Sequence, residues 1–210
     1  MENGNGTNGN GHDLKSSSMG FFGRLFNIAP FEWPRVTECW LITFLFKLGS
    51  ATGWTVITAA FVSRFGIQYL PMLFVMNATL IIASTFFFEQ LIVRFKREIL
   101  MILMLILGSL CLFFASFLYD RSAIAFFTLV IFAESFFLAQ FNVFIPILVG
   151  DRFTPLESQR TFPFVESGDT IGIAIGGAIV GIFASQFPIQ WFLHLWIIFL
   201  MFTILVFVIV

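Results

Sequence analysis

Six long apolar stretches fill the chain from Val36 to its last residue, and three of them carry ionisable side chains. Lys47 lies in the first stretch, Glu134 in the fourth, and Glu166 and Asp169 in the fifth. A helix of about 20 apolar residues, rising about 1.5 Å per residue, matches the roughly 30 Å hydrocarbon core of a bilayer. The sequence therefore predicts an integral membrane protein with charges inside its spans.

The pattern within the stretches selects the fold class. The mean hydropathy is +0.96 and only 11% of residues are charged, so a soluble domain is excluded. A membrane β-barrel would need short segments of alternating polarity, which the sequence does not contain. We expect an all-α membrane protein, a bundle of six transmembrane helices. The predicted spans are 36–62, 70–93, 99–118, 123–149, 162–184 and 190–210.

The chain begins with two segments that precede the spans. Residues 1–18 are rich in Asn, Gly and Ser, lack the apolar core of a signal peptide, and are predicted to be a disordered tail. Residues 19–35 mix Phe, Leu and Trp with Arg24, Glu32 and Arg35, as an interfacial amphipathic segment does.

Basic residues are distributed unevenly between the two ends of the predicted bundle. Connections are short, so neighbouring spans are antiparallel, and positive charge accumulates on the cytoplasmic side. Eight basic residues fall on the side of the N-terminus and two on the other, which predicts a cytoplasmic N-terminus. The eight are Lys15, Arg24, Arg35, Arg94, Lys96, Arg97, Arg152 and Arg160, and the two are Arg64 and Arg121.

Lys47 and Glu134 are the first candidates for a functional site. Each lies about eleven residues into its span, from opposite sides, which places both at roughly 16 Å depth near the midplane. Charges at that depth are costly and often mark a transport path. The alternatives are a purely structural ion pair, or a lysine whose stem reaches towards the interface.

Gln140 and Asn142 are further candidates for the transport path. Asn142 follows Glu134 by eight residues and shares its helix face, whereas Gln140 is rotated away from it. Amide side chains in a span either join helices by hydrogen bonds or line a polar cavity, and the sequence leaves both readings open.

The fifth span contains a small-residue ridge. Gly168, Gly172 and Gly176 recur every four residues, a spacing that lets a neighbouring helix approach closely. We expect this face to pack against another helix, either of this bundle or of a second one. The ridge could also be a sliding surface.

A charged latch is predicted at the cytoplasmic end. Glu166 and Asp169 lie three residues apart near the expected start of the fifth span, on the side where the basic loops gather. Ion pairs there could close the mouth of a path, although simple exposure at the interface is the alternative. The predicted latch residues are Arg94, Lys96, Arg97, Asp151, Arg152, Arg160, Glu166 and Asp169.

Other classes of function find little support. Ser167-Gly168 and His194 resemble the pair of an intramembrane serine protease, but Val165 replaces the first glycine of its Gly-x-Ser-Gly motif, so we predict no enzyme. The two cysteines are isolated and no cluster of metal-ligating residues occurs in the sequence, so we predict no metal or cofactor. A nucleic-acid partner is not expected either.

Four short motifs occur along the chain. A Phe-Gly-x-x-x-Leu-Pro pattern follows the first span, and two arginines stand in the second-to-third loop. The fourth span contains an Ala-Glu pair, and an Arg-x-Phe-Pro pattern followed by spaced glycines opens the fifth. The residues are Phe65, Gly66, Leu70, Pro71, Arg94, Arg97, Ala133, Glu134, Arg160, Phe162, Pro163, Gly168 and Gly172. Together these motifs resemble those of the major facilitator superfamily, in its ATP/ADP antiporter-like branch, and the similarity covers about 31–210.

The resemblance implies the N-terminal six-helix half of a twelve-span secondary transporter in the bacterial inner membrane. Its first and fourth helices would line the path of a small solute, which crosses by alternating access between two bundles. The second bundle would be a C-terminal half missing from this chain, or a second copy. Trp54 and Ile57 stand where the nucleotide antiporters carry basic residues, so nucleotides are not the expected substrate. The rival prediction is a non-transporting membrane scaffold or assembly protein.

Overall fold

A computed structural model describes residues 28, 29 and 31–209 of the chain, so the predicted tail 1–18 lies outside the described residues. Six helical stretches are long and apolar enough to cross a membrane, and the described residues contain no strand, which confirms the predicted helical class. The elements are α3 (Trp33–Phe65), the 3-10 turn η1 (Ile67–Tyr69), α4 (Leu70–Ile92), α5 (Arg97–Leu118), α6 (Ala123–Phe132), the π-helical segment η2 (Ala133–Leu138), α7 (Ala139–Arg152), α8 (Pro155–Phe183) and α9 (Ile189–Ile209).

The first span begins earlier than the sequence analysis predicted. Pro34 stands in the first turn of α3, where its missing N–H costs nothing, and the helix begins at Trp33. Positions 33–35 of the predicted interfacial segment are therefore part of the first span, while positions 19–27 lie outside the described residues. Gly66 ends α3 with a φ of 92°, a conformation that glycine adopts without strain.

The start of the fifth span differs most from its predicted position. Thr154 and Glu157 form a capping box, in which the Thr154 hydroxyl accepts from the Glu157 N–H and the Glu157 carboxylate accepts from the Thr154 N–H. With Pro155 at the first position, α8 begins seven residues before the predicted start at 162. Residues 157–161 are all polar, so hydropathy alone did not include this first part of the helix.

The fourth span is interrupted by a wide turn. It runs through α6, η2 and α7, and in η2 the Ala139 N–H donates to the Glu134 carbonyl oxygen, five residues back. A π-helical turn holds one residue more than an α-helical turn, and such turns are frequent at functional sites. Glu134 therefore lies in the one irregular turn of the fourth span.

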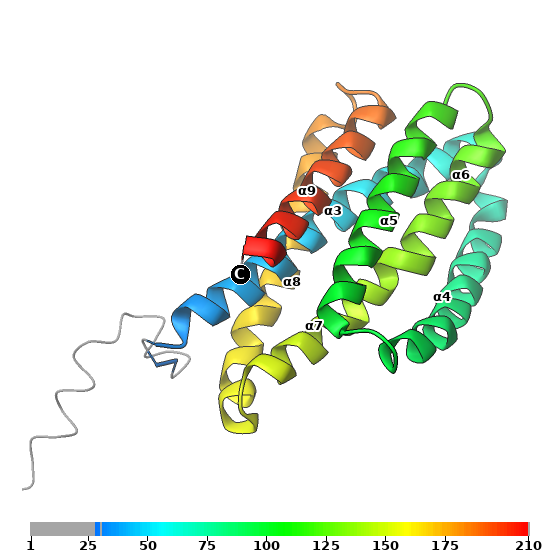
Figure 1. Ribbon diagram of the computed structural model, residues 1–210. Helices are drawn as coiled ribbons and strands as arrows, with labels where there is room; N and C mark the ends of the chain where they lie inside the picture. The colour runs from blue at the N-terminus through cyan, green and yellow to red at the C-terminus, as the bar shows by residue number, and fades with distance from the viewer. Residues whose placement is uncertain (1–27, 30, 210) are drawn as a thin grey trace, which may run out of the picture.

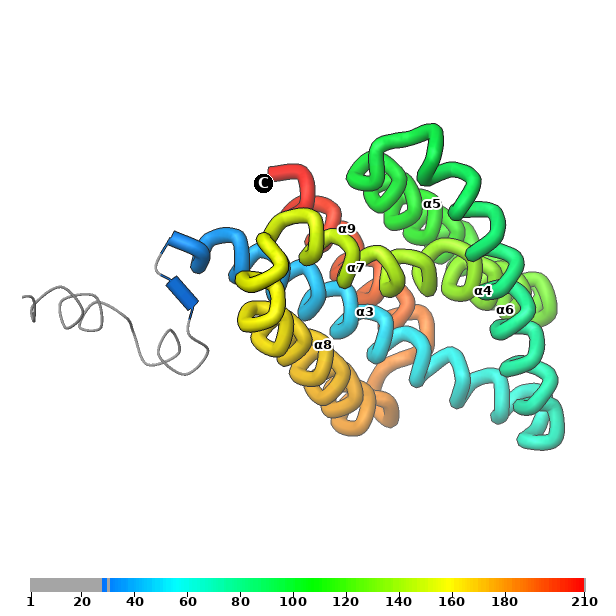
Figure 2. The backbone as a smooth tube through the Cα atoms, turned by 90° about the horizontal axis from the view of Figure 1, so that it is seen from below, coloured from blue at the N-terminus to red at the C-terminus, as the bar shows by residue number. Residues whose placement is uncertain are grey.

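α3 is packed between α8 on one side and α9 on another (Figures 1 and 2). The predicted glycine ridge of α8 faces α3, which confirms that this face packs against a helix of the same bundle. A Cβ atom on Gly172 would lie 2.8 Å from the Phe44 carbonyl oxygen, and one on Gly168 would lie 2.9 Å from that of Trp40. Only glycine allows the two backbones to approach this closely.

Two glycines of α3 make the matching contact with α9. A Cβ atom on Gly53 would lie 2.0 Å from the Trp196 ring, and one on Gly49 would lie 3.0 Å from the Phe199 Cβ. Trp196 is fully buried and is one of the largest side chains in the core. α3 is therefore held on two faces by close approach at glycine.

The elements alternate in direction through the bundle. Figure 1 shows the start of α3, the α4–α5 connection and the α7–α8 connection at one end, and the other three connections at the opposite end. The first end carries six of the described basic residues, and the opposite end carries two. We call the first the basic end. α4 is the most peripheral helix and exposes large apolar side chains, such as Val75 and Phe86, at 65% each.

Candidate functional site

A small polar cleft lies where α3, α7 and α8 meet. Its volume is about 80 Å³. It brings together Lys47 and the two carboxylates that the sequence analysis placed in a latch, and adds Asn142 from the predicted transport path. The cleft is lined by Thr43, Lys47, Asn142, Ile145, Pro146, Glu166 and Asp169.

Lys47 forms an ion pair with Asp169 at the centre of this cleft. The Lys47 Nζ lies 2.6 Å from the Asp169 Oδ1, and the two side chains are 24% and 23% exposed. This corrects the prediction that placed Asp169 in a latch at the mouth. Because α8 begins at Pro155, Asp169 is fourteen residues along its helix, as Lys47 is fourteen residues along α3 from Trp33.

Glu134 forms no ion pair with any residue that the structure describes. Its carboxyl group is deep in the bundle, close enough to Lys47 for the two charges to interact. The Glu134 Oε2 is buried and has no hydrogen-bond partner among the described residues. The prediction that Lys47 and Glu134 face one cavity is therefore met only in part, because Glu134 is near Lys47 but does not line the cleft.

The wide turn η2 brings Glu134 and Asn142 onto one face. An α-helix rotates by roughly 100° per residue, so residues eight apart differ by roughly 80°. One extra residue in the turn reduces the effective separation to seven steps, and the difference to roughly 20°. Asn142 lines the cleft, and its Oδ1, like the Glu134 Oε2, is buried without a hydrogen-bond partner among the described residues.

Gln140 lies elsewhere and joins two helices. Its Nε2 donates to the Ser84 Oγ at 2.7 Å, to the Thr85 Oγ1 at 2.9 Å and to the Ile81 carbonyl oxygen at 3.2 Å, all on α4. The side chain is buried and does not line the cleft. The structure therefore supports the reading of Gln140 as a polar contact between helices, and not its place in the transport path.

Three ion pairs connect helices at the basic end. The Arg97 Nη1 lies 2.6 Å from the Asp151 Oδ2, which joins two predicted latch residues. Arg152 and Arg160 pair with acidic residues of the N-terminal region that the sequence analysis did not place in the latch. Arg152 binds Glu38 at 2.8 Å, and Arg160 binds the fully buried Glu32. Glu32 and Glu38 stand at the predicted cytoplasmic end, and that position could have identified them.

The remaining latch candidates make no such contact. Arg94 and Lys96 are exposed in the α4–α5 connection and form no ion pair with any described residue. Glu166 is exposed and lines the cleft, without an ion pair to the described part of the chain. The pairs that join helices at the basic end are thus those of Arg97, Arg152 and Arg160.

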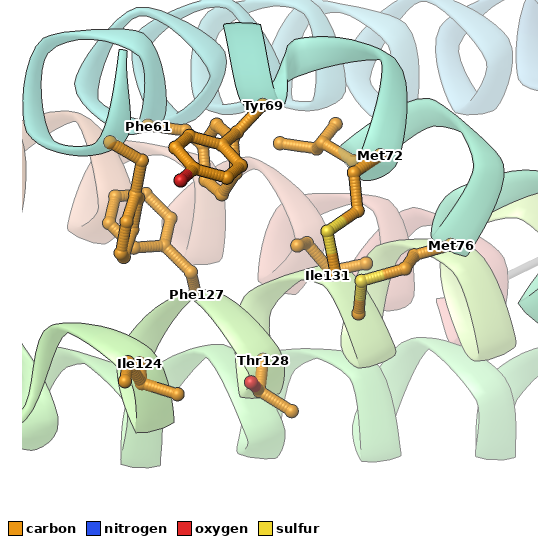
Figure 3. A pocket seen from close by; sticks show the side chains of 10 residues that line it. Phe61, Tyr69, Met72, Met76, Ile124, Phe127, Thr128 and Ile131 are labelled. Atoms are coloured by element: carbon orange, nitrogen blue, oxygen red, sulfur yellow. The ribbon is translucent and has the colours of Figure 1, made fainter.

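A larger pocket lies towards the other end of the bundle, between the end of α3, the start of α4, and α6. Its volume is about 220 Å³, and its lining is apolar, with Thr128 and Tyr69 as the hydroxyl-bearing residues (Figure 3). Phe61, Phe127 and Met72 project into it (Figure 3). Without a charged group, this pocket lacks the chemistry to recognise a polar solute. The smaller cleft is the candidate site because it holds Lys47, Glu166 and Asp169.

Neither metal ligands nor relatives identify the site further. The described residues contain no group of three or more His, Cys, Asp or Glu side chains that could hold a metal ion. No family model, no curated protein and no solved structure matches the chain. The cleft itself is therefore the basis for a functional proposal.

Proposed function

We propose that this chain is a six-helix bundle of a secondary transporter of the major facilitator type. It moves a small solute across the membrane by alternating access, with its N-terminus in the cytoplasm. The polar cleft between α3, α7 and α8 is part of the transport path. The Lys47–Asp169 pair, with Glu134 nearby, is the observation that carries this proposal.

The free-energy cost of burying these charged and polar side chains is the physical reason for the proposal. A charged side chain inside hydrocarbon costs several kcal/mol, and a purely structural contact between helices is made as well by apolar side chains. Among the described residues, Glu134 and Asn142 each keep a buried oxygen without a hydrogen-bond partner, although a bundle selected only for rigidity would satisfy or replace them. Groups kept at such a cost are expected to bind something that enters and leaves.

Alternating access needs a second bundle that rocks against this one. It would be a C-terminal half or a second copy of the chain. The ion pairs of Arg97, Arg152 and Arg160 hold the ends of α3, α5, α7 and α8 together at the basic end. The Arg97–Asp151 and Arg152–Glu38 pairs are partly exposed to water, so they can form and break during a transport cycle, whereas Glu32 holds Arg160 from a fully buried position.

Water access to the cleft tests the proposal without knowledge of the substrate. Cys39 and Cys111 are replaced by alanine, and a single cysteine is introduced as Asn142→Cys. A hydrophilic, membrane-impermeant thiol reagent is then applied to each side of membranes that contain the full chain. We expect reaction at position 142 from an aqueous side, because only a thiol in contact with water ionises and reacts.

Leu110→Cys, in the same background, is the matched control. Leu110 is 46% exposed on the apolar helix α5, so its thiol should meet lipid and stay unreactive. If position 142 were as unreactive as position 110 from both sides, the cleft would be dry. The transport proposal would then be wrong, and a scaffold or assembly role would be favoured.

A further inference from the structure

The charges around the cleft are not balanced. Among the described residues that line it, Lys47 is the one cation, whereas Glu166 and Asp169 line it as carboxyl groups and Glu134 lies within electrostatic range of Lys47. Three carboxyl groups therefore surround one ammonium group. A site of this composition attracts a cation and repels an anion such as a nucleotide phosphate.

The unpaired atoms point to the same chemistry. The Glu134 Oε2 and the Asn142 Oδ1 are both acceptors, both buried, and both without a donor among the described residues. An amide oxygen and a carboxylate oxygen both accept hydrogen bonds. An ammonium group supplies the N–H donors and the positive charge that such oxygens lack, whereas an anionic ligand supplies neither.

The contact of Lys47 with Asp169 shows which chemical group the cleft can hold. Its ammonium lies 2.6 Å from the Asp169 Oδ1, so this carboxylate is already positioned to hold an alkylammonium. The cleft volume of about 80 Å³ has room for a small ligand only. Pockets that hold drug-sized ligands are several times larger, at roughly 300–1,000 Å³.

We propose that the cleft binds a small protonated amine, which replaces Lys47 on Asp169 while the Lys47 ammonium turns to Glu134. This inference rests on the proposed transport function, and names its substrate class. In the bound state two cations face two carboxylates, and Glu166 stays exposed to solvent. The exchange gives the Glu134 carboxyl group a charged partner while Asp169 keeps one, and pairing is the condition for charges to remain in a low-dielectric interior.

Binding of methylammonium to the purified full chain in detergent tests this proposal. The midpoint of thermal unfolding is followed by tryptophan fluorescence, with methylammonium chloride, choline chloride and sodium chloride compared at equal ionic strength. A ligand that binds only the folded state raises the midpoint in a saturable way. We expect such a rise with methylammonium, and none with choline, which carries the same charge but no N–H donor.

Three variants locate the binding. Asp169→Asn should weaken methylammonium binding at least tenfold, because the ligand loses its charged acceptor. Lys47→Ala should strengthen it several-fold, because the competing ammonium is gone, and added methylammonium should recover the stability that this variant loses. Glu89→Gln removes a carboxylate from the exposed surface of α4, and should leave binding unchanged.

The outcomes separate this inference from the proposed function. No saturable effect of methylammonium on either the wild type or Lys47→Ala would overturn the amine proposal. An equal effect of sodium or choline, or a loss of binding in Glu89→Gln, would overturn it as well. Reaction of Asn142→Cys with the hydrophilic reagent would still support transport in those cases, whereas an unreactive cysteine would refute transport whatever methylammonium does.

Discussion

At the scale of single residues, the Lys47–Asp169 pair combines features of surface and buried ion pairs. The two side chains keep about a quarter of their surface exposed, so water screens part of their attraction. They also lie in the middle of long apolar helices, where an unpaired charge is costly. The pair should therefore matter more as a way to avoid an isolated charge than as a source of net stability.

A double-mutant cycle on this pair is the first prediction. Lys47→Met and Asp169→Asn alone should each lower the free energy of unfolding by roughly 1–3 kcal/mol, between the values for exposed and buried pairs. The double variant should lose less than the sum, because neither charge is left alone. The measurement is unfolding in detergent, and strictly additive effects would show that the two charges do not interact.

Gln140 provides the second prediction. Gln140→Leu removes the donor that reaches Ser84, Thr85 and the Ile81 carbonyl oxygen, so the free energy of unfolding should fall by roughly 1–3 kcal/mol. Gln90→Leu, on the exposed surface of α4, is the control and should be close to neutral. Thiol labelling at position 142 should be the same with and without Gln140→Leu. A change in labelling without a loss of stability would support a role of Gln140 in the transport path instead.

At the scale of helices, close approach at glycine determines the position of α3. The ridge of α8 meets backbone atoms of α3, and the glycines of α3 receive the Trp196 ring of α9. Without water to drive apolar groups together, helices in a membrane associate through such packing contacts. The same contacts set the register of α3 against α8, and this register brings Lys47 beside Asp169.

Two glycines of α8 give a matched pair for the third prediction. A Cβ on Gly172 would lie 2.8 Å from a backbone oxygen and must push α3 away, whereas a Cβ on Gly177 meets nothing within 4 Å. Gly172→Ala should cost roughly 1–3 kcal/mol. Gly177→Ala should be neutral or stabilise the helix by up to about 1 kcal/mol. Thermal unfolding of both variants measures these changes in stability. Equal changes for the two variants would show that the glycine ridge does not hold α3 in place.

The sequence predicted the helices better than the contacts between them. Apolar length identified all six spans, and the four-residue glycine spacing predicted the close interface, because both signals are local. The capping box at Thr154 and Glu157 was also local, but it stands in a polar segment that hydropathy leaves outside the span. The wide turn at η2 depends on a change of hydrogen-bond partners, for which the sequence carries no clear signal.

The sequence singled out four of the residues that line the cleft, but it divided them between a transport path and a separate latch. Lys47, Asn142, Glu166 and Asp169 all line the cleft, as unusual polar residues in apolar spans. The partner of Lys47 depends on the register between α3 and α8, which depth counting from uncertain helix ends could not provide. An error of seven residues at the start of α8 moved Asp169 by about 10 Å along its helix axis.

At the scale of the whole molecule, the two ends of the bundle differ in charge. The basic end holds Arg35, Arg94, Lys96, Arg97, Arg152 and Arg160, and the opposite end holds Arg64 and Arg121. Arginine and lysine next to membrane spans are retained in the cytoplasm. The described helices alternate as this distribution requires, so the basic end is predicted to be cytoplasmic.

Labelling of single cysteines from either side of the membrane tests this orientation. Cys39 and Cys111 are first replaced by alanine. Lys96→Cys then stands at the basic end, and Arg121→Cys and Gln186→Cys stand at the opposite end, all three exposed. An impermeant maleimide applied outside intact cells should label positions 121 and 186, and inverted vesicles should expose position 96. Labelling of 96 and 121 from the same side would contradict the six-span topology, and labelling of 96 alone on intact cells would invert it.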